Sequence, residues 1–138
     1  MEYKFKYDNE EYILNENNCE DFLNDEENEV LDFSIEKTIE LLNNKDDAYW
    51  DIEYYKRACQ VCFKGKEENE KIFKFLEYHF YVFTKDSKYV MSNISKEYEN
   101  TSYNKLEKAK KVDNSYIVNV IVCPYCKKYS IEIEQCDM

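Results

Sequence analysis

The chain has 138 residues, of which 43% are apolar and 36% are charged, and its formal net charge is −11. Its single glycine, Gly65, excludes the glycine-rich phosphate loops of nucleotide-binding proteins. Its single histidine, His79, excludes a metal site built on two histidines. The 14 Tyr, 8 Phe and 1 Trp predict a folded aromatic core, although the mean hydropathy is −0.83. The length is that of one domain, residues 1–138.

The charge is unevenly distributed along this domain. Residues 1–54 hold 18 acidic residues and four lysines, whereas residues 55–138 hold 12 acidic and 15 basic residues. Two simple solvated faces would explain this pattern. A bipolar surface is the alternative, in which the acidic N-terminal part repels nucleic acid and attracts a basic partner.

The first third of the chain predicts a hairpin, two helices and a strand. Apolar and polar residues alternate on either side of a polar turn in residues 3–14, which is typical of a β-hairpin. Residues 18–24 are expected to form a short helix. Ser34 is a suitable N-cap for a second helix over residues 35–44. Alternation resumes at Trp50 and predicts a strand that leads towards Cys59.

The remainder predicts further strands with two more helices. Apolar spacing favours a helix over residues 67–76, followed by a strand to Thr84 and a turn at residues 85–88. The later segments are a strand at 89–91, a loop at 92–101, a short helix at 103–110 and strands at 116–122 and 129–134. The expected fold class is therefore α+β.

Two C-x-x-C pairs are the strongest signal in the sequence. Cys59 and Cys62 form the first pair, and Cys123 and Cys126 form the second, at the predicted tip of a hairpin. Each pair can offer two thiolates to one metal ion from a tight turn, and two such turns complete a tetrahedral set. The sequence therefore predicts one structural Zn²⁺ held by these four cysteines.

With these pairs the chain resembles the zinc-ribbon group, in which two knuckles at hairpin tips clamp one zinc ion. The resemblance covers residues 56–66 and 116–134 and implies that Cys59, Cys62, Cys123 and Cys126 are the ligands. Sixty residues separate the pairs, far more than in a compact ribbon. The resemblance therefore implies zinc-ribbon-like hairpins with a long helix-and-strand insertion between the two knuckles. The whole chain also looks like a small uncharacterised family, a domain of unknown function, from low-GC bacteria.

Other interpretations of the cysteines remain open. A disulfide within each pair, or iron in a four-sulfur site, would use the same residues. Cys-Pro-Tyr-Cys also resembles the glutaredoxin active site, but only 12 residues follow Cys126 and no second proline is present. Cys19 and Cys136 are left over: Cys19 is expected to be a small buried residue, and Cys136 is expected close to the two pairs but not as a ligand. His79 is expected to be a core or subsurface residue.

These features favour a small, non-catalytic, zinc-binding protein that binds another protein. A four-thiolate shell leaves no position for a reactive water, so no enzyme activity is expected. The alternative is a nucleic-acid-binding ribbon that uses the lysines of residues 105–111 together with Lys127 and Lys128. No targeting or membrane segment is visible, so a soluble cytoplasmic protein is expected, where thiols stay reduced.

Overall fold

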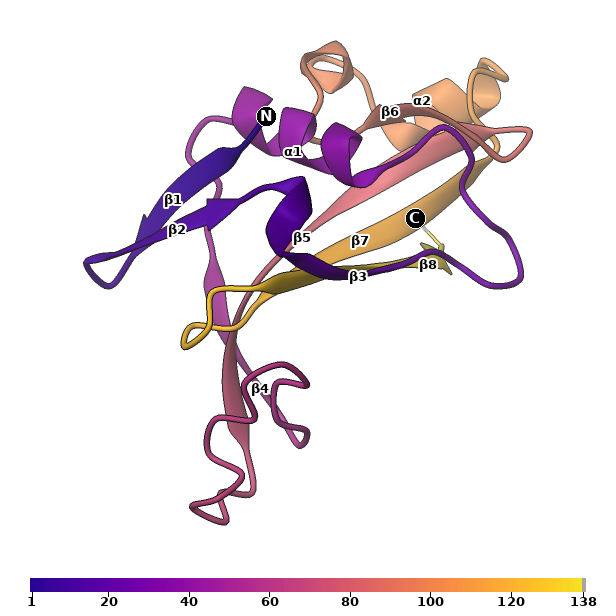
Figure 1. The fold of residues 1–138 in the computed structure, drawn as a ribbon. Coiled ribbons are helices and arrows are strands. Elements are labelled where there is room, and N and C mark those ends of the chain that lie inside the picture. Colours follow the sequence, from indigo (N-terminus) through magenta and orange to yellow (C-terminus); the bar gives the residue numbers. More distant parts are fainter. Residues whose placement is uncertain (138) are drawn as a thin grey trace.

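The fold was analysed in a computed structural model, which describes residues 1–137 (Figure 1). It is a mixed α+β fold in which strands dominate. Its strands are β1 (Tyr3–Tyr7), β2 (Glu10–Leu14), β3 (Cys19–Leu23), β4 (Asp51–Tyr55), β5 (Phe73–Lys85), β6 (Lys88–Ser92), β7 (Asn114–Val122) and β8 (Tyr129–Cys136). Its helices are α1 (Ile35–Asn44), α2 (Tyr103–Lys108) and the short 3₁₀ helices η1 (Glu16–Asn18) and η2 (Lys96–Tyr98).

A twisted main sheet organises the molecule. Its strand order is β3-β8-β7-β5-β4, and β6 pairs with the C-terminal end of β5. Strands β3 and β8 run parallel, and the other neighbours run antiparallel. Strands β1 and β2 form a separate two-stranded hairpin. The long segment between the two cysteine pairs therefore supplies β5 and β7, which are central strands of the main sheet.

Different elements pack against the two faces of the main sheet. Strands β5, β7 and β8 direct alternate apolar side chains, such as Phe80, Val120 and Ile131, into the large core. Helix α1 and the β1–β2 hairpin contribute Leu42 and Tyr12 to that core from above the sheet. On the opposite face, α2 and its neighbours cover one end of β5 with a second cluster, Phe83, Tyr103, Leu106 and Val112. The other end of this face, near the cysteines, carries exposed residues.

Several predicted elements are confirmed, and the local chemistry explains them. Asp8 and Asn9 both adopt positive φ values, of 50° and 65°, as a tight turn between twisted strands requires. The Ser34 side chain accepts a hydrogen bond from the backbone N–H of Lys37 and caps α1. Helix α2, the β5–β6 turn and strands β4, β6, β7 and β8 also lie where the sequence predicts them.

Two predicted helices are wrong. Residues 18–24 form strand β3 because this segment pairs with β8, more than a hundred positions later. The segment predicted as a helix over residues 67–76 consists of turns followed by the start of β5. Strand β5 is 13 residues long and pairs with both β4 and β7. The backbone hydrogen bonds of two neighbouring strands outweigh the local helical spacing.

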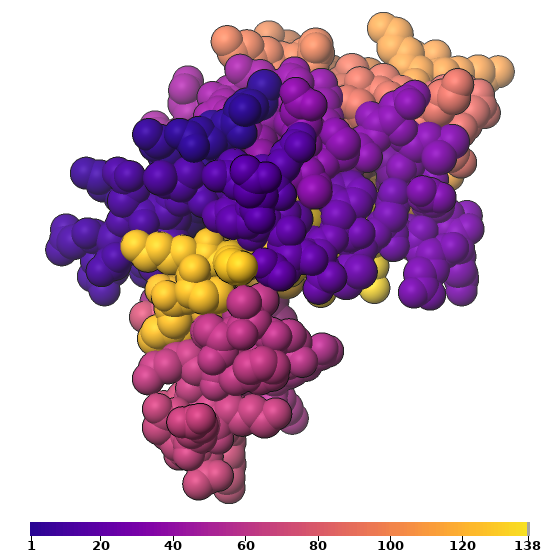
Figure 2. Space-filling view, viewed as in Figure 1, coloured from indigo at the N-terminus to yellow at the C-terminus, as the bar shows by residue number. Residues whose placement is uncertain are grey.

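A lobe formed by residues 56–72 projects from the body beyond the β4 and β5 ends (Figures 1 and 2). Turns make up this lobe, and the loop between β7 and β8 lies against its base. In the described part of the chain, every helix is too short or too polar to span a bilayer.

Candidate metal centre

The four predicted ligands lie together at one end of the main sheet. Cys59 and Cys62 follow β4 in the lobe, and Cys123 and Cys126 form the turn between β7 and β8. Strands β5 and β7 pair up to Leu76 and Val122, directly before the second pair, and so bring the two turns together. All four sulfur atoms lie within 4.8 Å of one another.

Two short sulfur–sulfur distances join one cysteine pair to the other. Cys59 Sγ lies 3.8 Å from Cys126 Sγ, and Cys62 Sγ lies 3.6 Å from Cys123 Sγ. All six cysteines of the chain are free thiols, so the structure does not show the disulfide alternative. The four sulfurs instead form one cluster shared by both turns.

The two cysteine turns share a backbone geometry. The N–H of Phe63 donates to the carbonyl oxygen of Cys59, and the N–H of Lys127 donates to that of Cys123, both at 2.9 Å. Phe63 and Lys127, each directly after the second cysteine of its pair, have φ values of 53° and 63°. Gly65, three residues after the first pair, also has a positive φ, of 92°. Residues with a Cβ rarely adopt this backbone conformation, so glycine is favoured at this position.

The thiols differ in their surroundings. Cys123 is buried and Cys62 is exposed, with the other two between these extremes. Burial raises the pKa of Cys123 and of Cys126 because a thiolate is poorly solvated there. Burial also opposes ionisation of Cys59, but hydrogen bonds from backbone N–H groups of Cys62 and Val61 outweigh it and lower its pKa. The Val61 N–H lies 3.4 Å from Cys59 Sγ.

This donor set fits a tetrahedral metal ion. Four thiolates at about 2.3 Å from a zinc ion would lie about 3.8 Å from one another. The distances between Cys59 and Cys126 and between Cys62 and Cys123, 3.8 Å and 3.6 Å, match that spacing. The cluster can therefore hold one metal ion of the kind that prefers sulfur, with Cys59, Cys62, Cys123 and Cys126 as its ligands. The arrangement is zinc-ribbon-like, with one pair after each of two hairpin strands.

The lysines beside the second pair bond to carboxylates of the N-terminal third. Lys127 Nζ lies 3.0 Å from a Glu10 oxygen, and Lys128 Nζ lies 3.1 Å from a Glu20 oxygen. The basic segment of residues 105–111 begins within α2 and precedes β7, whereas the second cysteine pair follows β7 at its other end (Figure 1). The structure therefore does not bring the two predicted groups of lysines into one basic surface.

The remaining candidate residues lie outside the cluster. Cys19 begins β3 and is half-buried instead of buried, and this partial burial raises the pKa of its thiol to about 11. Cys136 ends β8, at the opposite end of the strand from the cysteine turn, so the predicted position close to the pairs is wrong; its sulfur lies 3.8 Å from the Ser115 hydroxyl oxygen. His79 is exposed on β5 and its ring meets Tyr81 edge-on, so the predicted core or subsurface position is wrong.

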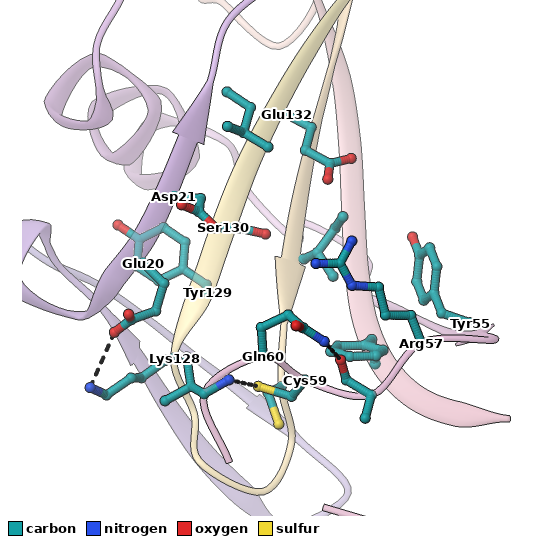
Figure 3. A pocket seen from close by; sticks show the side chains of 16 residues that line it. Glu20, Asp21, Tyr55, Arg57, Cys59, Gln60, Lys128, Tyr129, Ser130 and Glu132 are labelled. Atoms are coloured by element: carbon teal, nitrogen blue, oxygen red, sulfur yellow. Dashed lines mark hydrogen bonds and ion pairs between the residues drawn. The ribbon is translucent and has the colours of Figure 1, made fainter. Parts of the chain in front are cut away.

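A cavity beside the cysteines was not predicted from sequence (Figure 3). It has a volume of about 220 Å³ and is lined by residues of β3, β8 and the first cysteine turn, including Leu23, Arg57 and Glu132. These walls come from three distant segments, so no local pattern marks them. The one available signal was Arg57, the only arginine in the chain, two positions before Cys59.

Comparisons with known proteins give one match. No curated protein and no solved structure matches the chain. A family model described as "Protein of unknown function (DUF3785)" matches residues 3–138. Because this match spans nearly the whole sequence, the chain belongs to the DUF3785 family.

Proposed function

We propose that the protein is a zinc-binding protein whose four-cysteine site is structural. The observation that carries this proposal is the close grouping of the four sulfurs, which lie within 4.8 Å of one another and include two distances that suit a tetrahedral shell. Cys59 and Cys62 belong to the projecting lobe, and Cys123 and Cys126 belong to the β7–β8 turn. A shared metal ion would fasten the lobe to the main sheet.

Four thiolates close the coordination shell, so the site would not activate water. The residues between the cysteines, Gln60, Val61, Pro124 and Tyr125, offer no general base at neutral pH. We therefore propose a non-catalytic protein that acts through its surface. The excess of acidic residues in the N-terminal part suits a basic protein partner, and free thiolates suit a reducing compartment such as the cytoplasm.

Elemental analysis of untagged protein tests the site. We expect one zinc per chain, and X-ray absorption at the zinc edge should show four sulfur neighbours at about 2.3 Å. Cys123→Ser should lose the metal, whereas Cys136→Ser, a matched change outside the cluster, should retain it. Iron in place of zinc, or an oxygen neighbour in place of a sulfur, would contradict the proposal.

A further inference from the structure

The cavity beside the cysteines forms one end of a longer groove, because it shares Leu23 and Glu132 with a second hollow. Its floor is the exposed face of the main sheet, where Phe75 of β5 and Ile121 of β7 line it. The first cysteine turn forms one wall, with Val61, and strand β3 forms the other, with Leu23. Val61 is 38% exposed and Leu23 is 51% exposed, so apolar surface stands open to solvent on both walls.

This end of the groove has room for one large apolar side chain. An apolar cavity of about 150 Å³ suffices to bind benzene. The volume here is about 220 Å³, so a leucine or phenylalanine side chain would fit. Burying such a side chain against Phe75 and Ile121 would remove their remaining apolar surface from water.

The groove continues past Leu23 and Glu132 into a second hollow. Both residues also line that hollow, which lies between β8 and the loop after β3. The carboxylates along the two hollows are Glu20, Asp21, Asp25, Glu26, Glu27, Glu132 and Glu134. Only two cationic side chains line the same path, Arg57 and Lys128, and Lys128 already pairs with Glu20. The path is therefore strongly negative.

The cavity beside the cysteines also has hydrogen-bond donors on one side and acceptors on the other. Arg57 and Gln60 lie on the side of the cysteine turn, opposite Glu20 and Asp21 of β3 (Figure 3). Within residues 1–137, no ion pair engages the Arg57 guanidinium. Its donors are thus available for backbone carbonyl groups of an extended segment, while cationic side chains of that segment face the carboxylates.

From this arrangement we infer that the groove, lined by Leu23, Arg57, Val61, Ile121, Glu132 and Glu134, binds an extended basic segment of a partner protein, anchored by one apolar side chain beside the cysteine cluster. The inference rests on the proposed function, since it identifies the chemistry of the partner. The apolar cavity selects the anchor, and the carboxylates of β8 and the β3 loop select the flanking lysines or arginines. Nucleic acid is disfavoured because its phosphates would face these carboxylates.

Three capped fluorescent peptides test the specificity of the groove. In the first, one leucine is flanked on each side by lysines; the second has alanine for leucine, and the third has glutamates for lysines. Fluorescence anisotropy with the zinc-loaded protein should show binding of the first peptide. The second should bind about tenfold more weakly, because the apolar anchor is lost, and the third should not bind. Equal affinity for the first two peptides would overturn the apolar anchor and with it the inference.

Matched variants separate the groove from the general acidity of the chain. Glu132→Lys with Glu134→Lys should weaken binding of the first peptide by tenfold or more. Glu97→Lys with Glu99→Lys changes two exposed glutamates near η2 by the same charge and should weaken it by less than threefold. Leu23→Ser should weaken it severalfold, whereas Leu31→Ser, at the other exposed leucine, should not. Equal losses in the matched pairs would show unspecific attraction and overturn the inference.

Zinc content and circular dichroism on the same samples keep the two proposals distinct. A folded, zinc-loaded protein that does not bind the first peptide would overturn the groove and leave the metal site intact. A protein without zinc that still binds the peptide with the expected specificity would overturn the metal site and support the groove. Direct binding of a fluorescent single-stranded oligonucleotide to the protein, weakened by Leu23→Ser but not by Leu31→Ser, would assign the groove to nucleic acid and overturn the inference.

Discussion

Phe63 and Lys127 hold equivalent positions in the two cysteine turns and share a left-handed backbone, with φ values of 53° and 63°. In each turn, the residue's N–H donates to the carbonyl of the first cysteine of its pair. This conformation is costly for residues with a Cβ, by about 1–2 kcal/mol. The cysteine turns therefore carry backbone strain that the surrounding contacts must offset.

Phe63→Gly should relieve that strain. Glycine adopts positive φ freely but costs more conformational entropy on folding, so we expect a net gain of about 1 kcal/mol or less in the free energy of unfolding. Val61→Gly, in the same turn at a position without positive φ, should instead lower it. Chemical denaturation of the metal-loaded variants measures both. A loss in Phe63→Gly as large as that in Val61→Gly would show that the strain is negligible.

Cys123→Ser should destabilise the protein severely. Its thiol is buried where the lobe meets the β7–β8 turn, and loss of one ligand would remove the link between them. We expect a fall in melting temperature of more than about 10 °C, because losing several kcal/mol consumes much of a small domain's stability. Thermal melts by circular dichroism measure this fall. Cys136→Ser should remain within a few degrees of the parent protein, and an equal effect would rule out a special role for the cluster.

Trp50→Ala should separate the β1–β2 hairpin from the main sheet. The Trp50 side chain is buried, and its ring stacks on Phe5 with centroids 4.2 Å apart and planes 3° from parallel. It also contacts the ring of Tyr78 on β5. Removing so large a buried side chain should cost about 3–5 kcal/mol. Urea unfolding followed by circular dichroism checks this cost, with Tyr49→Ala, at an exposed neighbour, expected within about 0.5 kcal/mol of the parent.

Asp25→Asn should change how the free energy of unfolding depends on pH in the acidic range. Backbone N–H groups of Gln135, Asn28 and Glu27 donate to this carboxylate and lower its pKa below the ordinary value of 3.8. Because the folded-state pKa is depressed, the stabilisation is present above that ordinary value and is lost as the pH falls through the folded-state pKa. The variant should therefore be less stable than the parent at pH 7, and the difference should shrink in acid.

Unfolding curves at a series of pH values measure this difference. Asp46→Asn, at an exposed aspartate in the loop after α1, serves as the control and should follow the parent profile. A constant gap between the Asp25→Asn variant and the parent at every pH would contradict the assignment, since it would reflect lost packing instead of titration.

The cysteine turns could be predicted because their signals are local. The spacing of Cys123 and Cys126 between two alternating segments marks a hairpin tip, and the structure has that hairpin. Ser34 and the turn at Asp8 and Asn9 are likewise short-range features. Each of these predictions depended on residues within a few positions of one another.

Predictions failed where distant pairing decides the structure. Apolar spacing fits a helix over residues 67–76, but Phe75 pairs with β4 and Leu76 pairs with both β4 and β7, which holds this part of the chain extended. Strand β3 exists only because Phe22 and its neighbours pair with β8. The groove depends on the same strand order, since β3 and the first cysteine turn form its two walls. Local sequence carries no information about that order.

The strand order also dictates when the protein can complete its fold during synthesis. Strand β8, the last along the described chain, lies between β3 and β7 and must join them after both have been made. Until it leaves the ribosome, β3 lacks its only partner in the sheet, and the core lacks Ile131 and Ile133. The nascent chain therefore exposes unpaired strand edges and apolar surface until β8 has been made, and during that period it is at risk from aggregation and proteolysis.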